Sequence, residues 1–157
     1  MLLKTINKIT TVLGLVLLYN LSIAQETLRS KQFNLESGIA IQGYDPVAYF
    51  TEHNAVKGNK QFSAVVGGVT YLFASSSNHD LFLKNYMKYE PQYGGWCAYA
   101  MGANGEKVAI DPETFKITNG RLYLFYHSWT NNTLTKWNDN ENTLRIKADK
   151  NWQTIYY

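Results

Sequence analysis

The sequence contains only one cysteine, Cys97. A single cysteine excludes a disulfide within the chain. The first residues of the chain indicate export, and an exported protein keeps such a thiol in an oxidising compartment. The thiol is then buried and inert, bound to a metal, redox-active or paired with another molecule. Choosing among these states is most of the functional question.

An excess of charge of one sign is also missing. The chain has 15 basic and 12 acidic residues and no basic stripe, so it lacks the electrostatic footprint of a nucleic-acid-binding protein. It contains no serine–histidine–acid pattern, no phosphate-binding glycine loop and no dinucleotide fingerprint, which argues against hydrolases, kinases and dehydrogenases. Internal repeats and linkers are absent from the sequence, and this favours a single domain.

The main apolar run near the N-terminus is too short to span a bilayer. Residues 9–18 are mostly apolar, two lysines precede them, and the small residues Ser22 and Ala24 follow. A charged start, a short apolar core and two small residues are the features of a secretory signal peptide. We predict that residues 1–24 are a signal peptide and that the protein is periplasmic or secreted, with no stable membrane insertion after cleavage. The alternative is a retained membrane anchor.

The rest of the chain, residues 25–157, has the size and apolar content of one ordinary domain. Apolar runs around Gly67-Gly68 and around Asn119-Gly120 predict two β-hairpins. Further predicted elements are a short apolar strand at 47–50, a helix that begins near Ser76 and ends before Pro91, and helical segments at 133–138 and 141–150. Together they predict an α+β fold, a compact domain of β-hairpins packed with short helices and a C-terminal helical segment.

The surroundings of Cys97 favour a reactive thiol. Gly94 and Gly95 give the preceding backbone access to conformations closed to other residues. If residues 96–101 form a helix, Cys97 lies in its first turn, where free backbone N–H groups lower a thiol pKa and populate the thiolate. The thiolate is the form needed for nucleophilic chemistry and for metal binding.

Three further residues complete a candidate metal site with Cys97. Met101 shares a helical face with Cys97, and a thiolate beside a thioether suits Cu(I). His127 ends a strand expected to neighbour Cys97, and Asp45 is a candidate ligand or acid. Three of these four residues have a structural alternative: core packing for Cys97 and Met101, and turn formation for Asp45 before its proline. The expected cofactor is copper or another soft metal ion.

Several motifs resemble the YHS-domain family. The resemblance covers nearly the whole chain after the predicted signal peptide. Within the family, the chain is similar to the exported, stand-alone subfamily, with a core motif at about 38–91 and a C-terminal extension at 92–157. The motifs that carry it are Gly43–Phe50 (GYDPVAYF), Gly68–Ser75 (GVTYLFAS), Lys88–Pro91 (KYEP) and Tyr93–Tyr99 (YGGWCAY).

The resemblance implies metal binding through cysteines that follow an Asp-Pro-Val motif and an aromatic-Phe pair. In this chain those positions are Ala48 and Ala74, so the family's usual metal site does not carry over. The stand-alone relatives have a cysteine matching Cys97, and some resemble selenoproteins at that position. The resemblance therefore implies a reactive Cys97 but names no reaction.

Three functional hypotheses follow. The first is an exported binding module that holds a soft metal through Cys97. The second is a thiol redox enzyme with Cys97 as the catalytic residue and a small thiol or oxidant as its partner. The third is a non-catalytic structural or interaction module with a buried Cys97. Whether the protein is an enzyme stays open at this point.

Overall fold

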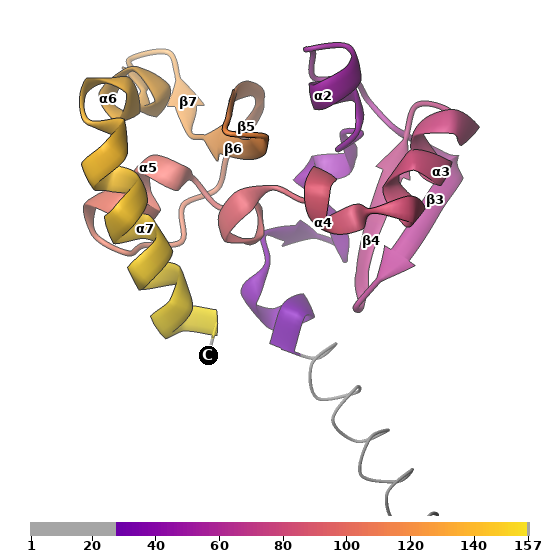
Figure 1. Cartoon of the computed structure of the whole chain (residues 1–157), viewed down its shortest axis with the longest axis horizontal. Coiled ribbons are helices and arrows are strands. Elements are labelled where there is room, and N and C mark those ends of the chain that lie inside the picture. The colour runs from indigo at the N-terminus through magenta and orange to yellow at the C-terminus, as the bar shows by residue number, and fades with distance from the viewer. Residues whose placement is uncertain (1–27, 157) are drawn as a thin grey trace, which may run out of the picture.

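A computed structural model of the chain describes residues 28–156 (Figure 1). The predicted signal peptide lies outside the described residues. Small sheets alternate with short helices, and a long helix ends the chain, which confirms the predicted α+β fold. None of the helices within residues 28–156 has both the length and the apolarity needed to cross a membrane.

The N-terminal part is built on a four-stranded sheet in the order β1-β2-β4-β3. Its strands are β1 (Leu35–Glu36), β2 (Ile39–Ala40), β3 (Asn59–Val66) and β4 (Val69–Phe73). The predicted hairpin of β3 and β4 is confirmed. Gly67 and Gly68 both have positive φ, 55° and 76°, which is the backbone twist that a two-residue hairpin turn requires. Ile39 of β2 pairs in parallel with Thr70 of β4.

Short helices cover this sheet and connect it to the rest of the chain: η1 (Ile41–Gly43), α2 (Ala48–Thr51), α3 (Ser76–Lys84) and α4 (Tyr86–Tyr89). The start of the helix predicted near Ser76 is confirmed, with Ser75 as its N-cap, whose hydroxyl accepts the N–H of Asn78 at 3.2 Å. The helix does not run unbroken to Pro91, because the backbone at Asn85 is not helical and separates α3 from α4. The predicted strand at 47–50 is wrong, because these residues form α2. The side chain of Asp45 explains the difference, since it accepts the N–H of Val47 at 2.8 Å and so caps a helix start.

The C-terminal part consists of η2 (Gln92–Gly95), α5 (Ala98–Ala103), β5 (Asp111–Thr118), β6 (Arg121–Phe125), β7 (His127–Ser128), β8 (Asn131–Asn132), α6 (Thr133–Asp139) and α7 (Glu141–Tyr156). The predicted hairpin around Asn119-Gly120 is confirmed as β5–β6. Helix α7 runs beyond the predicted 141–150. Its buried face continues from Leu144 and Ala148 to Trp152 and Ile155, at the spacing of one helical stripe.

Two adjoining apolar cores stabilise the fold. The larger lies among the four-stranded sheet, α2 and α3, where it contains Phe73 and Phe82, and it extends to α5 and β6. The smaller lies under α6 and α7 and contains Trp137. Figure 1 shows the two regions on opposite sides of the segment that runs through α4. Helices α5 and α7 pack closely because Gly102 has no side chain. A Cβ at that position would lie 2.5 Å from the carbonyl oxygen of Leu144.

Candidate functional site

Cys97 lies just before a helix. A helix over residues 96–101 would have placed it in the first turn, but α5 begins at Ala98 and Cys97 is its N-cap residue. The chain reaches it through Tyr93, Gly94 and Gly95, which all have positive φ, so the expected conformational freedom of the two glycines is used. The side chain of Cys97 is completely buried, with 0% exposure.

The thiol is hydrogen-bonded to two elements other than its own helix. Sγ accepts the backbone N–H of Tyr126 at 3.3 Å and lies 3.4 Å from Oγ1 of Thr133. The Thr133 hydroxyl donates its one proton to the carbonyl oxygen of Tyr126 at 2.7 Å, so the S–H donates to Oγ1. No N–H of α5 caps the sulfur. The thiol therefore links the start of α5 to the residue between β6 and β7 and to the start of α6.

Met101 is one helical turn from Cys97, and its N–H donates to the carbonyl oxygen of Cys97 at 3.0 Å. The two side chains pack in different cores. Cys97 belongs to the larger core, whereas Met101 is buried in the smaller one with Trp137 and Phe125. The thioether thus has the surroundings of a core-filling side chain.

His127 directly follows Tyr126, the residue that donates to Cys97, so this strand end does neighbour the thiol as predicted. Its side chain is exposed, and Nδ1 lies 3.3 Å from Oδ2 of Asp111. Asp111 also accepts hydrogen bonds from Thr114 and from the backbone of Glu113. The structure thus pairs His127 with an acid at the protein surface.

Asp45 is buried, and both of its carboxylate oxygens accept hydrogen bonds. Oδ1 accepts the N–H groups of Val47 and Ala48, at 2.8 and 3.3 Å. Oδ2 accepts the N–H of Ala74 and the side-chain amide of Asn78, both at 2.7 Å. This carboxylate therefore joins the start of α2 to the end of β4 and to α3, which extends the turn role considered for it. Within residues 28–156, no three His, Cys, Asp or Glu side chains group closely enough to hold a metal ion.

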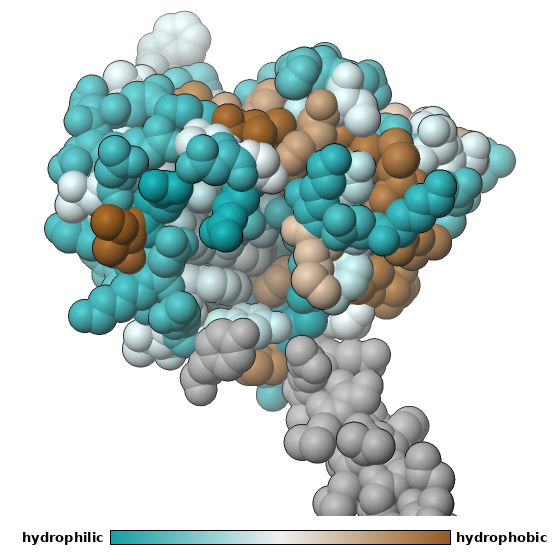
Figure 2. Space-filling view, in the orientation of Figure 1, coloured by the Kyte–Doolittle hydropathy of each residue, from teal (hydrophilic) through white to brown (hydrophobic). Residues whose placement is uncertain are grey.

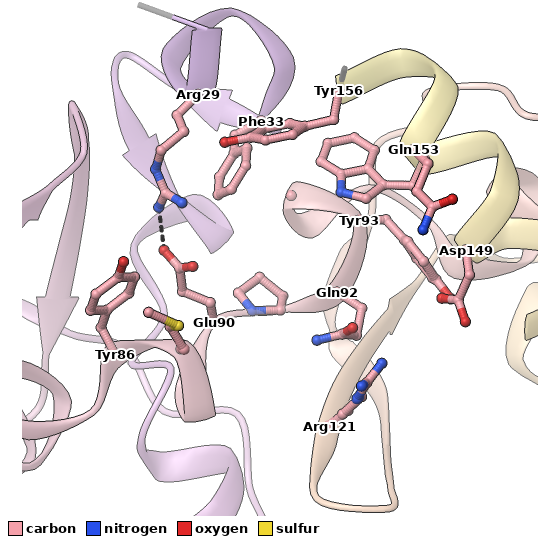
Figure 3. Close-up of a pocket in the computed structure, with 14 residues that line it drawn as sticks. Arg29, Phe33, Tyr86, Glu90, Gln92, Tyr93, Arg121, Asp149, Gln153 and Tyr156 are labelled. Atoms are coloured by element: carbon pink, nitrogen blue, oxygen red, sulfur yellow. Dashed lines mark hydrogen bonds and ion pairs between the residues drawn. The ribbon is translucent and has the colours of Figure 1, made fainter. Parts of the chain in front are cut away.

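A cleft of about 560 Å³ lies on another part of the surface (Figure 3). In the space-filling view the surface is hollowed between the hydrophilic side that carries α7 and the side that carries α3 and β4 (Figure 2). Segments far apart in the sequence contribute its lining: Arg29, Phe33, Tyr86, Met87, Glu90, Pro91, Gln92, Tyr93, Gly94, Arg121, Asp149, Trp152, Gln153 and Tyr156.

One end of the cleft carries a paired guanidinium and carboxylate. Arg29 donates to Oε1 of Glu90, and the hydroxyl of Tyr71 donates to the same oxygen at 2.6 Å. The guanidinium also lies over the ring of Phe33, 4.5 Å from its centre, which is a cation–π geometry. Burial and the neighbouring charge of Glu90 raise the pKa of Tyr71 well above its usual value, so this phenol stays a donor at neutral pH.

The other end carries opposite charges that do not pair with each other. The hydroxyl of Tyr93 donates to Oδ1 of Asp149 at 3.0 Å. Burial, followed by the charge of Asp149, raises the pKa of Tyr93, while the charge of Arg121 acts to lower it. Both charges therefore lie near the Tyr93 hydroxyl. Arg121 is exposed, and no ion pair or hydrogen bond joins its guanidinium to another described residue.

Aromatic rings form the wall between these two ends. The ring centres of Trp152 and Tyr156 are 5.5 Å apart, and Phe33 lies 6.1 Å from Trp152 and 6.3 Å from Tyr156. Aromatic walls with a few polar groups are typical of small-molecule sites. The arrangement can stack a flat or apolar group while charged side chains contact a polar end.

No pattern in the sequence predicted this cleft. Its lining comes from four separate segments, and their proximity depends on how α7 packs against α5 and η2. The available signals were Glu90 and the motif ending at Pro91, together with an aromatic residue, Trp152, on the predicted C-terminal helix. No protein-family model, curated protein or solved structure matches the chain.

Proposed function

We propose that this protein is a binding module whose small-molecule ligand occupies the cleft, and that Cys97 is a structural link in its core. The observation that carries the proposal is the contrast between the two sites. The cleft presents unpaired charges of both signs beside aromatic rings, whereas the thiol is fully buried with its hydrogen bonds satisfied.

The size and lining of the cleft support this proposal. Its volume of about 560 Å³ is within the range of roughly 300–1,000 Å³ that small-molecule sites occupy. Arg121 and Asp149 form no ion pair with another described residue, so both charges are available to pair with opposite charges on a ligand.

The proposal includes the resemblance to exported YHS-domain proteins. Two positions that carry cysteines elsewhere in that family, Ala48 and Ala74, both donate backbone N–H groups to Asp45. Their convergence on one carboxylate supports the resemblance, because a shared metal site would require the same two positions to be close. The sequence features of residues 1–24 support a periplasmic or secreted location.

Nuclear magnetic resonance of the indole N–H groups tests the binding proposal. The protein has four tryptophans, and the variant Trp152→Phe assigns the signal of the one in the cleft. Four matched probes are added in turn: L-phenylalanine, phenethylamine, 3-phenylpropionate and 2-phenylethanol. We expect at least one to shift the Trp152 signal in a saturable way. Trp129 is fully exposed and lies outside the cleft lining, so its signal is the internal control.

The proposal is overturned if none of the four probes shifts the Trp152 signal. Equal shifts at Trp129 and Trp152 also contradict it, because they mean general adsorption to aromatic surface. A saturable shift confined to Trp152 and its neighbours supports binding in the cleft.

Soft-metal binding through Cys97 is the second candidate function. The observation in its favour is the N–H of Tyr126 on Sγ, because a donor to sulfur also stabilises the thiolate that Cu(I) requires. The Thr133 hydroxyl would have to leave the sulfur to admit the metal. Anaerobic titration with Cu(I) tests the proposal against Cys97→Ser. Equal copper affinity of the two proteins contradicts it.

The same thiol in a redox role is tested by peroxide treatment and a sulfenic-acid probe. A redox cycle would need an external thiol, since the chain has no second cysteine to resolve the oxidised form. Labelling of Cys97 at a peroxide dose that modifies control thiols favours this role, and absence of labelling contradicts it.

A further inference from the structure

The charged residues of the cleft are divided unevenly between its ends. In Figure 3, Arg29, Glu90 and Tyr86 lie on one side of the opening, and Gln92, Tyr93 and Asp149 lie on the other, with Arg121 at the rim. Arg29 and Glu90 already neutralise each other. The charges left for a ligand are therefore those of Arg121 and Asp149, one positive and one negative.

Arg121 and Asp149 each keep hydrogen-bonding capacity. The guanidinium of Arg121 has no partner among the described residues, and its planar fork fits a carboxylate. Asp149 accepts one hydrogen bond from a described residue, on Oδ1 from Tyr93, so its second oxygen remains for a cationic donor. The two side chains come from the start of β6 and from α7 and do not form an ion pair with each other.

The remaining lining defines what lies between the charged ends. The rings of Phe33 and Trp152 form an apolar wall, Met87 is 72% exposed at the edge, and Pro91 is buried beside them. Since the Arg29–Glu90 pair offers no net charge, the part of the ligand that reaches it is uncharged. The lining thus suits an apolar or aromatic group attached to a head that carries both charges.

We infer that the cleft binds a small zwitterion of the α-amino acid type with an apolar or aromatic side chain, and this rests on the proposed function of the cleft. Its carboxylate is bound by Arg121, its ammonium by Asp149, and its side chain lies against Trp152 and Phe33. A simple cation would still face the guanidinium of Arg121, and a simple anion would face Asp149. Each singly charged ligand therefore satisfies one group and is repelled by the other.

Calorimetric titration with the four matched probes tests the inference. L-phenylalanine carries both charges, phenethylamine only the cation, 3-phenylpropionate only the anion, and 2-phenylethanol neither. We expect L-phenylalanine to bind about tenfold more tightly than either singly charged probe, which corresponds to one lost charge-assisted hydrogen bond, and more tightly still than 2-phenylethanol, which loses both.

Two variants make the test specific to the charged groups. Arg121→Gln weakens binding of L-phenylalanine about tenfold and makes phenethylamine bind more tightly than 3-phenylpropionate. Asp149→Asn weakens L-phenylalanine similarly and favours 3-phenylpropionate, while its amide oxygen still accepts from Tyr93. Lys147→Gln and Asp139→Asn are exposed matched controls outside the cleft lining and leave all four affinities unchanged.

The outcomes separate the inference from the proposed function. If 2-phenylethanol or a singly charged probe binds as tightly as L-phenylalanine, the zwitterion inference is overturned while the cleft remains a binding site. If Arg121→Gln and Asp149→Asn do not show opposite preferences between phenethylamine and 3-phenylpropionate, the inference is also overturned. If no probe binds and the Trp152 signal stays fixed, both the inference and the proposed function fail.

Discussion

The proposed structural role of Cys97 predicts a measurable loss of stability when the sulfur is removed. In Cys97→Ala the N–H of Tyr126 loses its acceptor and the Thr133 hydroxyl loses a donor. Transfer of a buried group of this size contributes about 1 kcal/mol, and an N–H left without a partner costs about 1–2 kcal/mol. We therefore expect the free energy of unfolding to fall by about 2–3 kcal/mol.

Urea unfolding followed by circular dichroism measures this change. For a domain of this size the loss corresponds to a decrease in Tm of about 10 °C. The free energy of unfolding of Cys97→Ser should fall by about half as much, because the serine hydroxyl still accepts the N–H of Tyr126. Thr133→Val removes the other hydrogen-bond partner of the thiol. The stability loss of the double variant Cys97→Ala/Thr133→Val should therefore differ from the sum of the two single losses by about 1 kcal/mol.

Alkylation of Cys97 in the native protein provides a second readout that does not depend on substitution. A buried thiol reacts only when the chain opens, so its rate should track the unfolding equilibrium and rise steeply with urea. Two results refute the reasoning: a variant Cys97→Ala within about 0.5 kcal/mol of the parent, or alkylation in buffer as fast as in urea. Either would return metal binding or redox chemistry to first place.

Three further predictions concern the rest of the fold. Asp45→Asn replaces an acceptor with a donor facing buried N–H groups and should cost about 2–4 kcal/mol in urea unfolding; an unchanged midpoint contradicts this. Gly102→Ala places a Cβ against the Leu144 carbonyl and should cost about 1–3 kcal/mol, whereas a neutral effect means that α7 moves freely. Although partial burial opposes it, the hydrogen bond from Lys116 lowers the pKa of Glu141. At pH 7 the free energy of unfolding of Glu141→Gln should therefore be lower than that of the parent protein by up to about 1 kcal/mol. This difference in stability should vanish as pH falls through the lowered pKa of Glu141. A difference that persists in acid excludes this ion pair as its cause.

The elements that the sequence predicted well are those specified by neighbouring residues. Both hairpins form around two-residue turns whose glycines or asparagine accept positive φ. Helix α3 begins after a serine cap, and the stripe of apolar residues on α7 is visible in the sequence. The conformational freedom expected of Gly94 and Gly95 before Cys97 is likewise used, since both have positive φ.

Residues 47–50 show where local patterns mislead. The run Val-Ala-Tyr-Phe has the composition of a strand, yet it forms the start and body of α2. The decisive contact is the carboxylate of Asp45, which is held in place by Ala74 and Asn78 from about thirty residues further along the chain. A helix cap that is positioned by tertiary contacts cannot be deduced from the sequence of the helix alone.

The sequence by itself determined the α+β composition and the two hairpins, because turn chemistry and apolar spacing act over a few residues. Only the tertiary structure decided what surrounds the thiol of Cys97 and where a ligand can enter. Thr133 and Tyr126 reach Cys97 from distant segments, and Arg121, Asp149 and Trp152 meet at the cleft because α7 packs against α5 and η2. Such contacts depend on the packing of whole elements, which no short stretch of sequence encodes.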